Sequence, residues 1–145
     1  MYRVLIPVDT NEQRARKQTE TIDSLPPIGD EVEVHVLHVY EEIDMPADEA
    51  GPAPIEQINE SLDELREIPE SVRQVIKELK SMEIEPIVHE KVGEPAETIL
   101  STARDLDADV ILMGVRDRTP IGKVVFGSVS QKVFLECDTP ILVAR

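Results

Sequence analysis

The chain has 145 residues, a length typical of one domain with a single substantial core. Its 30 acidic residues are twice its 15 basic residues, which gives a net charge of −15. This charge argues against nucleic acid or an anionic membrane as partner, because phosphates would be repelled. No apolar run approaches the roughly 20 residues of a membrane span, and the first residues lack a signal-peptide pattern, so we expect a cytoplasmic protein.

The acidic surplus has two explanations. It solvates the surface of a soluble protein, or it adapts the chain to high salt, where mobile ions screen the self-repulsion. Few lysines and an aromatic content of 3% favour the second explanation. Cys137 is the only cysteine, which excludes an internal disulfide, and no Cys/His cluster has the spacing of a zinc site.

The first predicted strand ends at a candidate site residue. Tyr2 to Val8 is a nearly continuous aliphatic run, typical of a strand at the centre of a parallel sheet. Thr10 with Gln13 forms a capping-box pattern and predicts a helix that runs to about Leu25. Asp9 therefore stands at the strand edge where open α/β sheets bind ligands. The alternative is that Asp9 only favours the helix dipole.

A second strand is predicted from Glu31 to Tyr40, where valines recur at alternate positions. His35 and His38 lie three residues apart, so they project to opposite faces and cannot share one metal ion. We interpret both as ordinary strand residues. The proline-rich acidic stretch 41–54 predicts a long connection, either an acidic linker or a lid.

The middle of the chain predicts a helix and an edge strand. Apolar residues recur at helical spacing from Ile55 to Leu79 and predict one amphipathic helix, bent or interrupted at Pro69. Ile84 to Val92 contains Pro86, which a central strand would not tolerate, so this strand is expected at the sheet edge. His89 in it is expected to face solvent.

Alternation of helices and strands continues to the end of the chain. A helix is predicted to begin near Glu94, with Pro95 in its first turn. Its buried face is expected to hold Ile99, Leu100, Ala103 and Leu106. Ala108 to Met113 and Pro140 to Ala144 predict the last two strands, and Val129 to Glu136 predicts the helix between them.

The stretch from Val110 to Ser130 carries the strongest functional pattern. A buried-strand run meets Gly114, and a loop with two further glycines leads to Ser128, which with Gln131 predicts a helix N-cap. Unpaired N–H groups and the helix dipole both favour an anion at such a place. The pattern predicts a phosphate cradle.

Two other phosphate motifs fit the chain less well. A P-loop requires G-x4-G-K-[ST], and residues 117–124 lack its first glycine and its metal-binding hydroxyl. A dinucleotide fingerprint would follow the first strand directly, where the chain has Pro7-Val8-Asp9-Thr10 instead.

The glycine loop, the helix after it and the closing strand Pro140-Ile141-Leu142-Val143 resemble the nucleotide loop of the universal stress protein family. Gly114, Gly127 and Ser128 fit the family pattern, whereas Asp117 stands where ATP-binding members have glycine. The first strand through Asp9 and the segment Leu37-His38-Val39 extend the resemblance over nearly the whole chain.

The resemblance implies a single-domain open parallel five-stranded α/β sheet in the order 3-2-1-4-5 with helices on both faces, and the alternating pattern predicts the same class. In that order Asp9 and the Gly114 loop converge at the switch point. The resemblance further implies a set of residues that would hold ATP, with Mg2+ as a candidate companion and the backbone of Val39 recognising adenine: Pro7, Val8, Asp9, Val39, Met113, Gly114, Arg116, Asp117, Gly127, Ser128, Val129 and Ser130.

Two functions of different classes stay open. The first is a cytoplasmic stress-response regulator that binds ATP or a related adenine nucleotide and hydrolyses it slowly or not at all, because no general base or nucleophile accompanies the cradle. The second, favoured by Asp117, is a homodimeric interaction module that does not bind ATP. An ATP-pyrophosphatase-type enzyme fits less well, because the Ser-Gly-Gly-rich loop it needs after the first strand is absent.

A homodimer is expected through the last strand. Pro140 to Ala144 is short and apolar and lies at a predicted sheet edge. An unpaired edge of this kind favours pairing with its symmetry mate. The family resemblance implies the same association.

Overall fold

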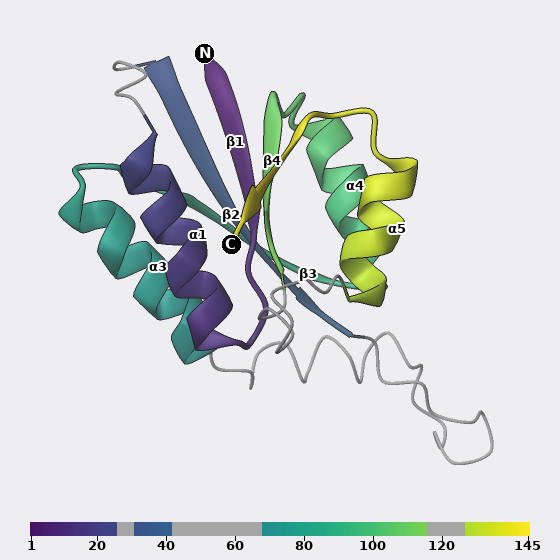
Figure 1. Cartoon of the computed structure of the whole chain (residues 1–145), viewed down its shortest axis with the longest axis horizontal. Coiled ribbons are helices and arrows are strands. Elements are labelled where there is room, and N and C mark those ends of the chain that lie inside the picture. Colours follow the sequence, from purple (N-terminus) through teal and green to yellow (C-terminus); the bar gives the residue numbers. More distant parts are fainter. Residues whose placement is uncertain (26–30, 42–67, 116–126) are drawn as a thin grey trace, which may run out of the picture.

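The computed structural model describes residues 1–25, 31–41, 68–115 and 127–145 (Figure 1). Five parallel strands form one sheet in the order β3-β2-β1-β4-β5, which confirms the predicted fold class. The strands are β1 (Tyr2–Pro7), β2 (Val32–Tyr40), β3 (Ile87–Val92), β4 (Val110–Gly114) and β5 (Ile141–Ala144). The described helices are α1 (Glu12–Ser24), α3 (Glu70–Ser81), α4 (Pro95–Asp105) and α5 (Ser128–Glu136).

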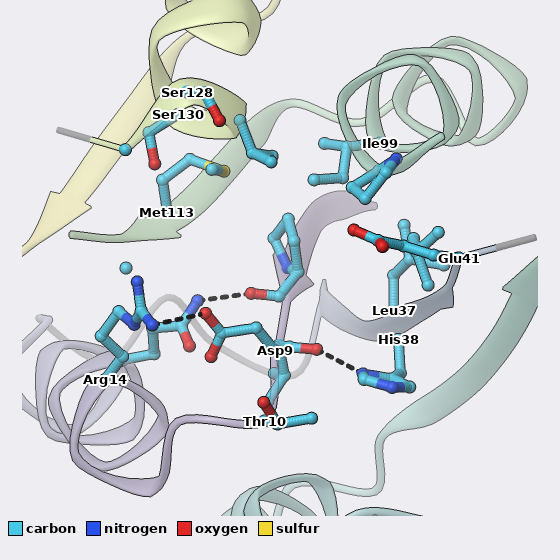
Figure 2. A pocket seen from close by; sticks show the side chains of 18 of the residues that line it. Asp9, Thr10, Arg14, Leu37, His38, Glu41, Ile99, Met113, Ser128 and Ser130 are labelled. Atoms are coloured by element: carbon cyan, nitrogen blue, oxygen red, sulfur yellow. Dashed lines mark hydrogen bonds and ion pairs between the residues drawn. The ribbon is translucent and has the colours of Figure 1, made fainter. Parts of the chain in front are cut away.

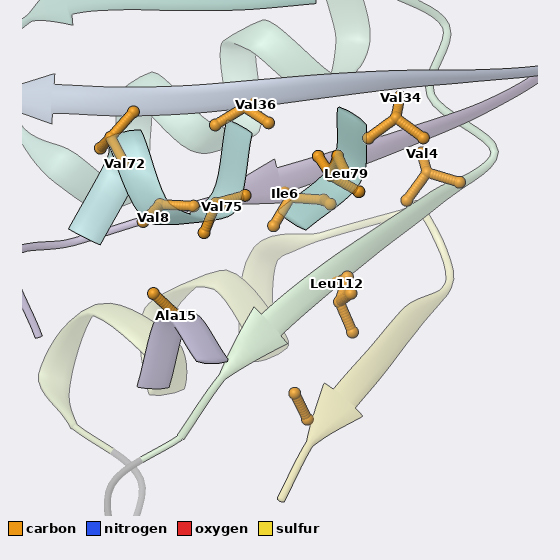
Figure 3. Packing of buried hydrophobic residues seen from close by; sticks show 11 residues of the cluster. Val4, Ile6, Val8, Ala15, Val34, Val36, Val72, Val75, Leu79 and Leu112 are labelled. Atoms are coloured by element: carbon orange, nitrogen blue, oxygen red, sulfur yellow. The ribbon is translucent and has the colours of Figure 1, made fainter. Parts of the chain in front are cut away.

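Helices cover both faces of the sheet, as predicted (Figure 1). On one face, Val4 and Ile6 of β1 pack with Ala15 of α1 and with Val75 and other apolar residues of α3 (Figure 3). These side chains are at most 2% exposed. Burying each large aliphatic side chain contributes about 1.5–3 kcal/mol, so this face is a main source of stability.

The opposite face packs against α4 and α5. Leu5 lies between Val4 and Ile6 in β1 and points to this opposite face. It packs there with residues of the neighbouring strands, Leu37, Ile111 and Met113. The α4 residues Ile99, Leu100 and Ala103 are buried against them as predicted, with Leu106 partly buried beside them. Apolar side chains on both sides of one strand explain why the strand sequences read as continuous apolar runs.

β1 and β4 pair over a short stretch and then separate. The register of β1 with β2 runs from Tyr2↔Val32 to Pro7↔Leu37, whereas β1 and β4 pair only at Val4↔Val110 and Leu5↔Ile111. Helices α1 and α5, the next described helices after β1 and β4, lie on opposite faces of the sheet, so a crevice opens at the carboxyl ends of these strands (Figure 1).

The two predicted helix caps are each wrong by one residue. α1 is capped by Asn11, whose side-chain oxygen accepts the Arg14 N–H at 2.9 Å, and not by Thr10. The Asn11 N–H in turn binds the Asp9 carboxylate at 2.9 Å, which moves the helix start one residue on. α5 is capped by Gly127, and Ser128 is its first helical residue with no side-chain capping bond.

The predicted helix from Ile55 to Leu79 is described only in its second half. α3 begins at Glu70, and Pro69 is its N-cap with an extended ψ of 147°, so α3 does not continue through this proline. The first half, and the connection 42–54, lie outside the described residues.

β3 lies at the sheet edge as predicted but begins at Ile87, after Pro86. Ile84 instead donates its N–H to Leu79 and closes the end of α3. His89 is expected to face solvent, but it is only partly exposed. Its ring stacks on His35 with centroids 5.1 Å apart, and the two rings share a 2.8 Å hydrogen bond.

Candidate functional site

A pocket of about 510 Å3 opens at the carboxyl ends of β1 and β4. This volume lies within the range of small-molecule sites. Ten of the predicted site residues line it: Pro7, Val8, Asp9, Val39, Met113, Gly114, Gly127, Ser128, Val129 and Ser130. Arg116 and Asp117 lie outside the described residues. The topology thus brings together residues that are more than 100 positions apart in the sequence.

Asp9 projects from the loop between β1 and α1 into this pocket (Figure 2). Its Oδ1 accepts the Asn11 N–H, and its Oδ2 pairs with Arg14 Nη2 at 3.1 Å. Ser71 of α3 donates its hydroxyl to the Asp9 carbonyl. A carboxylate offers about four acceptor positions, so the half-exposed Asp9 keeps capacity for a ligand hydroxyl.

Gln18 joins the two strands where their ladder ends. Its amide nitrogen donates to the Pro7 carbonyl at 2.7 Å and to the Leu112 carbonyl at 3.1 Å. The residue is only 2% exposed. These bonds give both carbonyls a side-chain donor beyond the last β1–β4 pair, and buried carbonyls require a partner.

Gly114 allows α1 to approach the end of β4. A Cβ atom added at Gly114 would lie 3.3 Å from Cδ of Gln18 and 3.4 Å from Cβ of Arg14. Both contacts are tight, so any larger residue would push α1 outward or fill the mouth of the pocket.

His38 fixes the β2 side of the pocket. It is 5% exposed, and its Nδ1 donates to the Val8 carbonyl at 2.7 Å, which leaves Nε2 as an acceptor in the neutral ring. Its ring meets Tyr40 edge to face at 4.6 Å. This packing positions the neighbouring Val39 backbone at the pocket wall.

The N-terminus of α5 forms the side of the pocket opposite β2. Ser128, Val129 and Ser130 line it with their N-cap Gly127. No acidic side chain occupies the first turn of this helix. The first-turn N–H groups and the positive end of the dipole therefore favour an anion there.

Among the described residues, no group of three His, Cys, Asp or Glu side chains is placed to hold a metal ion. No helix in the described ranges is long and apolar enough to cross a membrane.

Sequence reasoning missed several pocket residues. Arg14 and Gln18 read as polar residues of a surface helix, and only their spacing of four, which puts both on one helical face, hints at a shared role. Thr10, Leu37, His38, Tyr40, Glu41, Pro95 and Ile99 also line the pocket.

The topology and the pocket define a single-domain parallel α/β fold with a pocket at the switch point of its sheet. A model of the universal stress protein family matches residues 1–145. The chain belongs to the universal stress protein family.

Three relatives illustrate the similarity. A universal stress protein of Mycolicibacterium smegmatis is 41% identical over 59 residues, which are 40% of this chain and less than half of the relative, at 45%. The solved structure of hypothetical protein MJ0577, from Methanocaldococcus jannaschii, has a TM-score of 0.74 and 25% identity over 99% of this chain and 94% of that one. A universal stress protein from Archaeoglobus fulgidus in complex with dAMP has a TM-score of 0.64 and 21% identity over 100% and 98%.

Proposed function

We propose that this protein is a regulator that binds an adenine nucleotide, ATP in the first instance, in the pocket between β1 and β4. The observation that carries the proposal is the convergence of Asp9, the Val39 backbone and the N-terminus of α5 on one cavity of about 510 Å3. The complex of the Archaeoglobus fulgidus relative with dAMP supports the same ligand class.

Each part of the pocket suits one part of the nucleotide. The β2 wall offers the Val39 backbone and apolar neighbours, Leu37 and Ile99, which suit a flat base. Asp9 has free acceptor positions for a ribose hydroxyl. The first turn of α5 suits phosphate oxygens. Mg2+ would be held by the phosphates. Titrating nucleotide with and without Mg2+ tests whether the metal contributes to binding.

The Asp9 variant tests this assignment. Asp9→Asn is expected to weaken binding of adenosine about tenfold or more, because a charge-assisted hydrogen bond is lost. Asp23→Asn is a matched control, since Asp23 is exposed near the far end of α1. Isothermal titration calorimetry measures both. Equal affinities in the two variants would remove Asp9 from the site.

A homodimer through β5 belongs to the same proposal. β5 pairs with β4 on one side only, and its outer edge meets no other described strand. Its residues Ile141, Leu142 and Val143 are partly exposed. An apolar open edge favours pairing with a second copy.

The stress-response role and the cytoplasmic location are part of the proposal, and the membership of this chain in the family supports them. The competing function, an interaction module without nucleotide, keeps the dimer and leaves the pocket without a ligand. Nucleotide binding by the purified protein separates the two.

A further inference from the structure

Arg14 supplies positive charge to a pocket that is otherwise acidic. Among the described lining residues, Asp9 and Glu41 are acidic and Arg14 is the one permanent cation. The whole chain carries −15, so a phosphorylated ligand enters an unfavourable field. A cation beside the phosphates would offset this repulsion.

The guanidinium of Arg14 is only partly used by the protein. Its Nη2 pairs with Asp9, while its Nε is buried and has no hydrogen-bond partner among the described residues. A buried donor without an acceptor disfavours the present pose. The five N–H donors of a guanidinium form a planar fork that matches phosphate oxygens, so a phosphate would satisfy more of them than Asp9 does.

The position of Arg14 suits the phosphate end of a nucleotide. Its Cβ lies against Gly114, the residue where β4 ends. In the close view, Arg14 lies on the same side as Ser128 and Ser130, with Glu41 on the other side beside Ile99 (Figure 2). The cation and the first turn of α5 thus contribute positive potential to one part of the pocket.

We infer that Arg14 is a specificity-determining residue that selects phosphorylated adenosine over adenosine by binding phosphate from the α1 side. On ligand binding the guanidinium turns from Asp9 toward the phosphate oxygens and keeps at most one bond to the carboxylate. The inference rests on the proposed function, because it names the residue that reads the charged part of the same ligand.

The test compares ligands that differ only in phosphate. Adenosine, AMP and ATP are titrated by calorimetry into the wild-type protein, Arg14→Gln and Arg14→Lys. Arg16→Gln is the matched control, because Arg16 is exposed on the same helix and does not line the pocket. Circular dichroism melting confirms that each variant is folded.

Arg14→Gln is expected to weaken AMP and ATP about ten- to a hundredfold, the usual cost of a lost charged hydrogen bond, and to leave adenosine within about twofold. Its binding of ATP should also depend less steeply on salt concentration than that of the wild type. Arg14→Lys should lose less affinity for AMP and ATP than Arg14→Gln does. Arg16→Gln should bind all three ligands as the wild-type protein does.

An equal loss for adenosine and ATP would overturn the inference, since Arg14 would then act only by holding Asp9. Unchanged ATP affinity in Arg14→Gln would overturn it as well. If the wild-type protein bound neither adenosine nor ATP, the proposed function itself would fail and this inference with it. That result is distinguishable from the first two, because they require binding by the wild-type protein.

Discussion

Two imidazole rings, of which His35 is buried and His89 partly exposed, belong to a chain of polar contacts at the β2–β3 side of the sheet. Arg3 Nε lies 3.4 Å from the Glu33 carboxylate, which pairs with His35 Nε2 at 2.5 Å, and His35 Nδ1 bonds to His89 Nε2. Only one proton fits between the two rings, so both cannot be fully protonated without breaking this bond. Burial, then the charges of His35 and Lys91, lower the pKa of His89.

The free energy of unfolding should fall as pH drops below about 6.5. The unfolded chain protonates His89 near its ordinary value of 6.5, whereas the folded chain resists protonation until lower pH. Between these two values the unfolded state binds more protons, so stability is lost with a slope of at most about 1.4 kcal/mol per pH unit. Urea unfolding between pH 8 and about 5.5 measures it.

His89→Gln should make the free energy of unfolding depend less steeply on pH between 8 and about 5.5. Glu33 cannot cause the loss of stability in this pH range in place of His89. The hydrogen bond from His35 lowers the pKa of Glu33 from 4.5, so the contribution of Glu33 to stability is lost only at still lower pH. The same slope in the variant and the wild type would show that His89 does not titrate differently on folding.

The side-chain amide of Gln18 bonds helix α1 to two strands of the sheet. Gln18 donates to the Pro7 and Leu112 carbonyls at the point where β1 and β4 separate, so one side chain connects α1 to both strands. Gln18→Leu is expected to destabilise the protein by about 2–5 kcal/mol, because each unsatisfied buried carbonyl costs about 1–3 kcal/mol. Denaturant unfolding measures the loss.

Gln13→Leu is the control for this variant. Gln13 lies on the same helix and is exposed, so the same substitution there should change stability by no more than about 0.5 kcal/mol. Equal stability of the two variants would mean that the strands satisfy these carbonyls without Gln18.

The strands could be predicted because long apolar runs allow few alternatives, whereas their order in the sheet was implied by the resemblance to the universal stress protein family. The caps could not be predicted, since Thr10, Asn11 and Ser128 all have capping side chains and the choice depends on where the preceding segment ends. The His35–His89 contact requires the β2–β3 register, which pairs Leu37 with His89 and puts both rings on one face. Arg14 and Gln18 become recognisable as pocket residues only once α1 is placed against β4.

The net charge of −15 should make the whole molecule sensitive to salt. Raising ionic strength from about 0.01 M to about 1 M shortens the screening length from roughly 30 to 3 Å, so the self-repulsion of the folded chain weakens. The melting temperature is expected to rise across this range. A melting temperature that stays flat would contradict adaptation to high salt.

Association through β5 should also depend on salt, because two chains of the same sign repel each other. Light scattering at micromolar concentration and about 1 M salt is expected to give the mass of a dimer, with more monomer at low salt. A stable monomer under both conditions would contradict the dimer.

The proposed binding of an adenine nucleotide between β1 and β4 can be tested directly. Titrating 15N-labelled protein with AMP and ATP in high salt, and following amide chemical shifts, tests both the ligand and the place. We expect saturable shifts at Val39, Gly114 and the first turn of α5, with much weaker binding of GTP. No shifts at millimolar nucleotide, or shifts confined to residues away from the pocket, would contradict it.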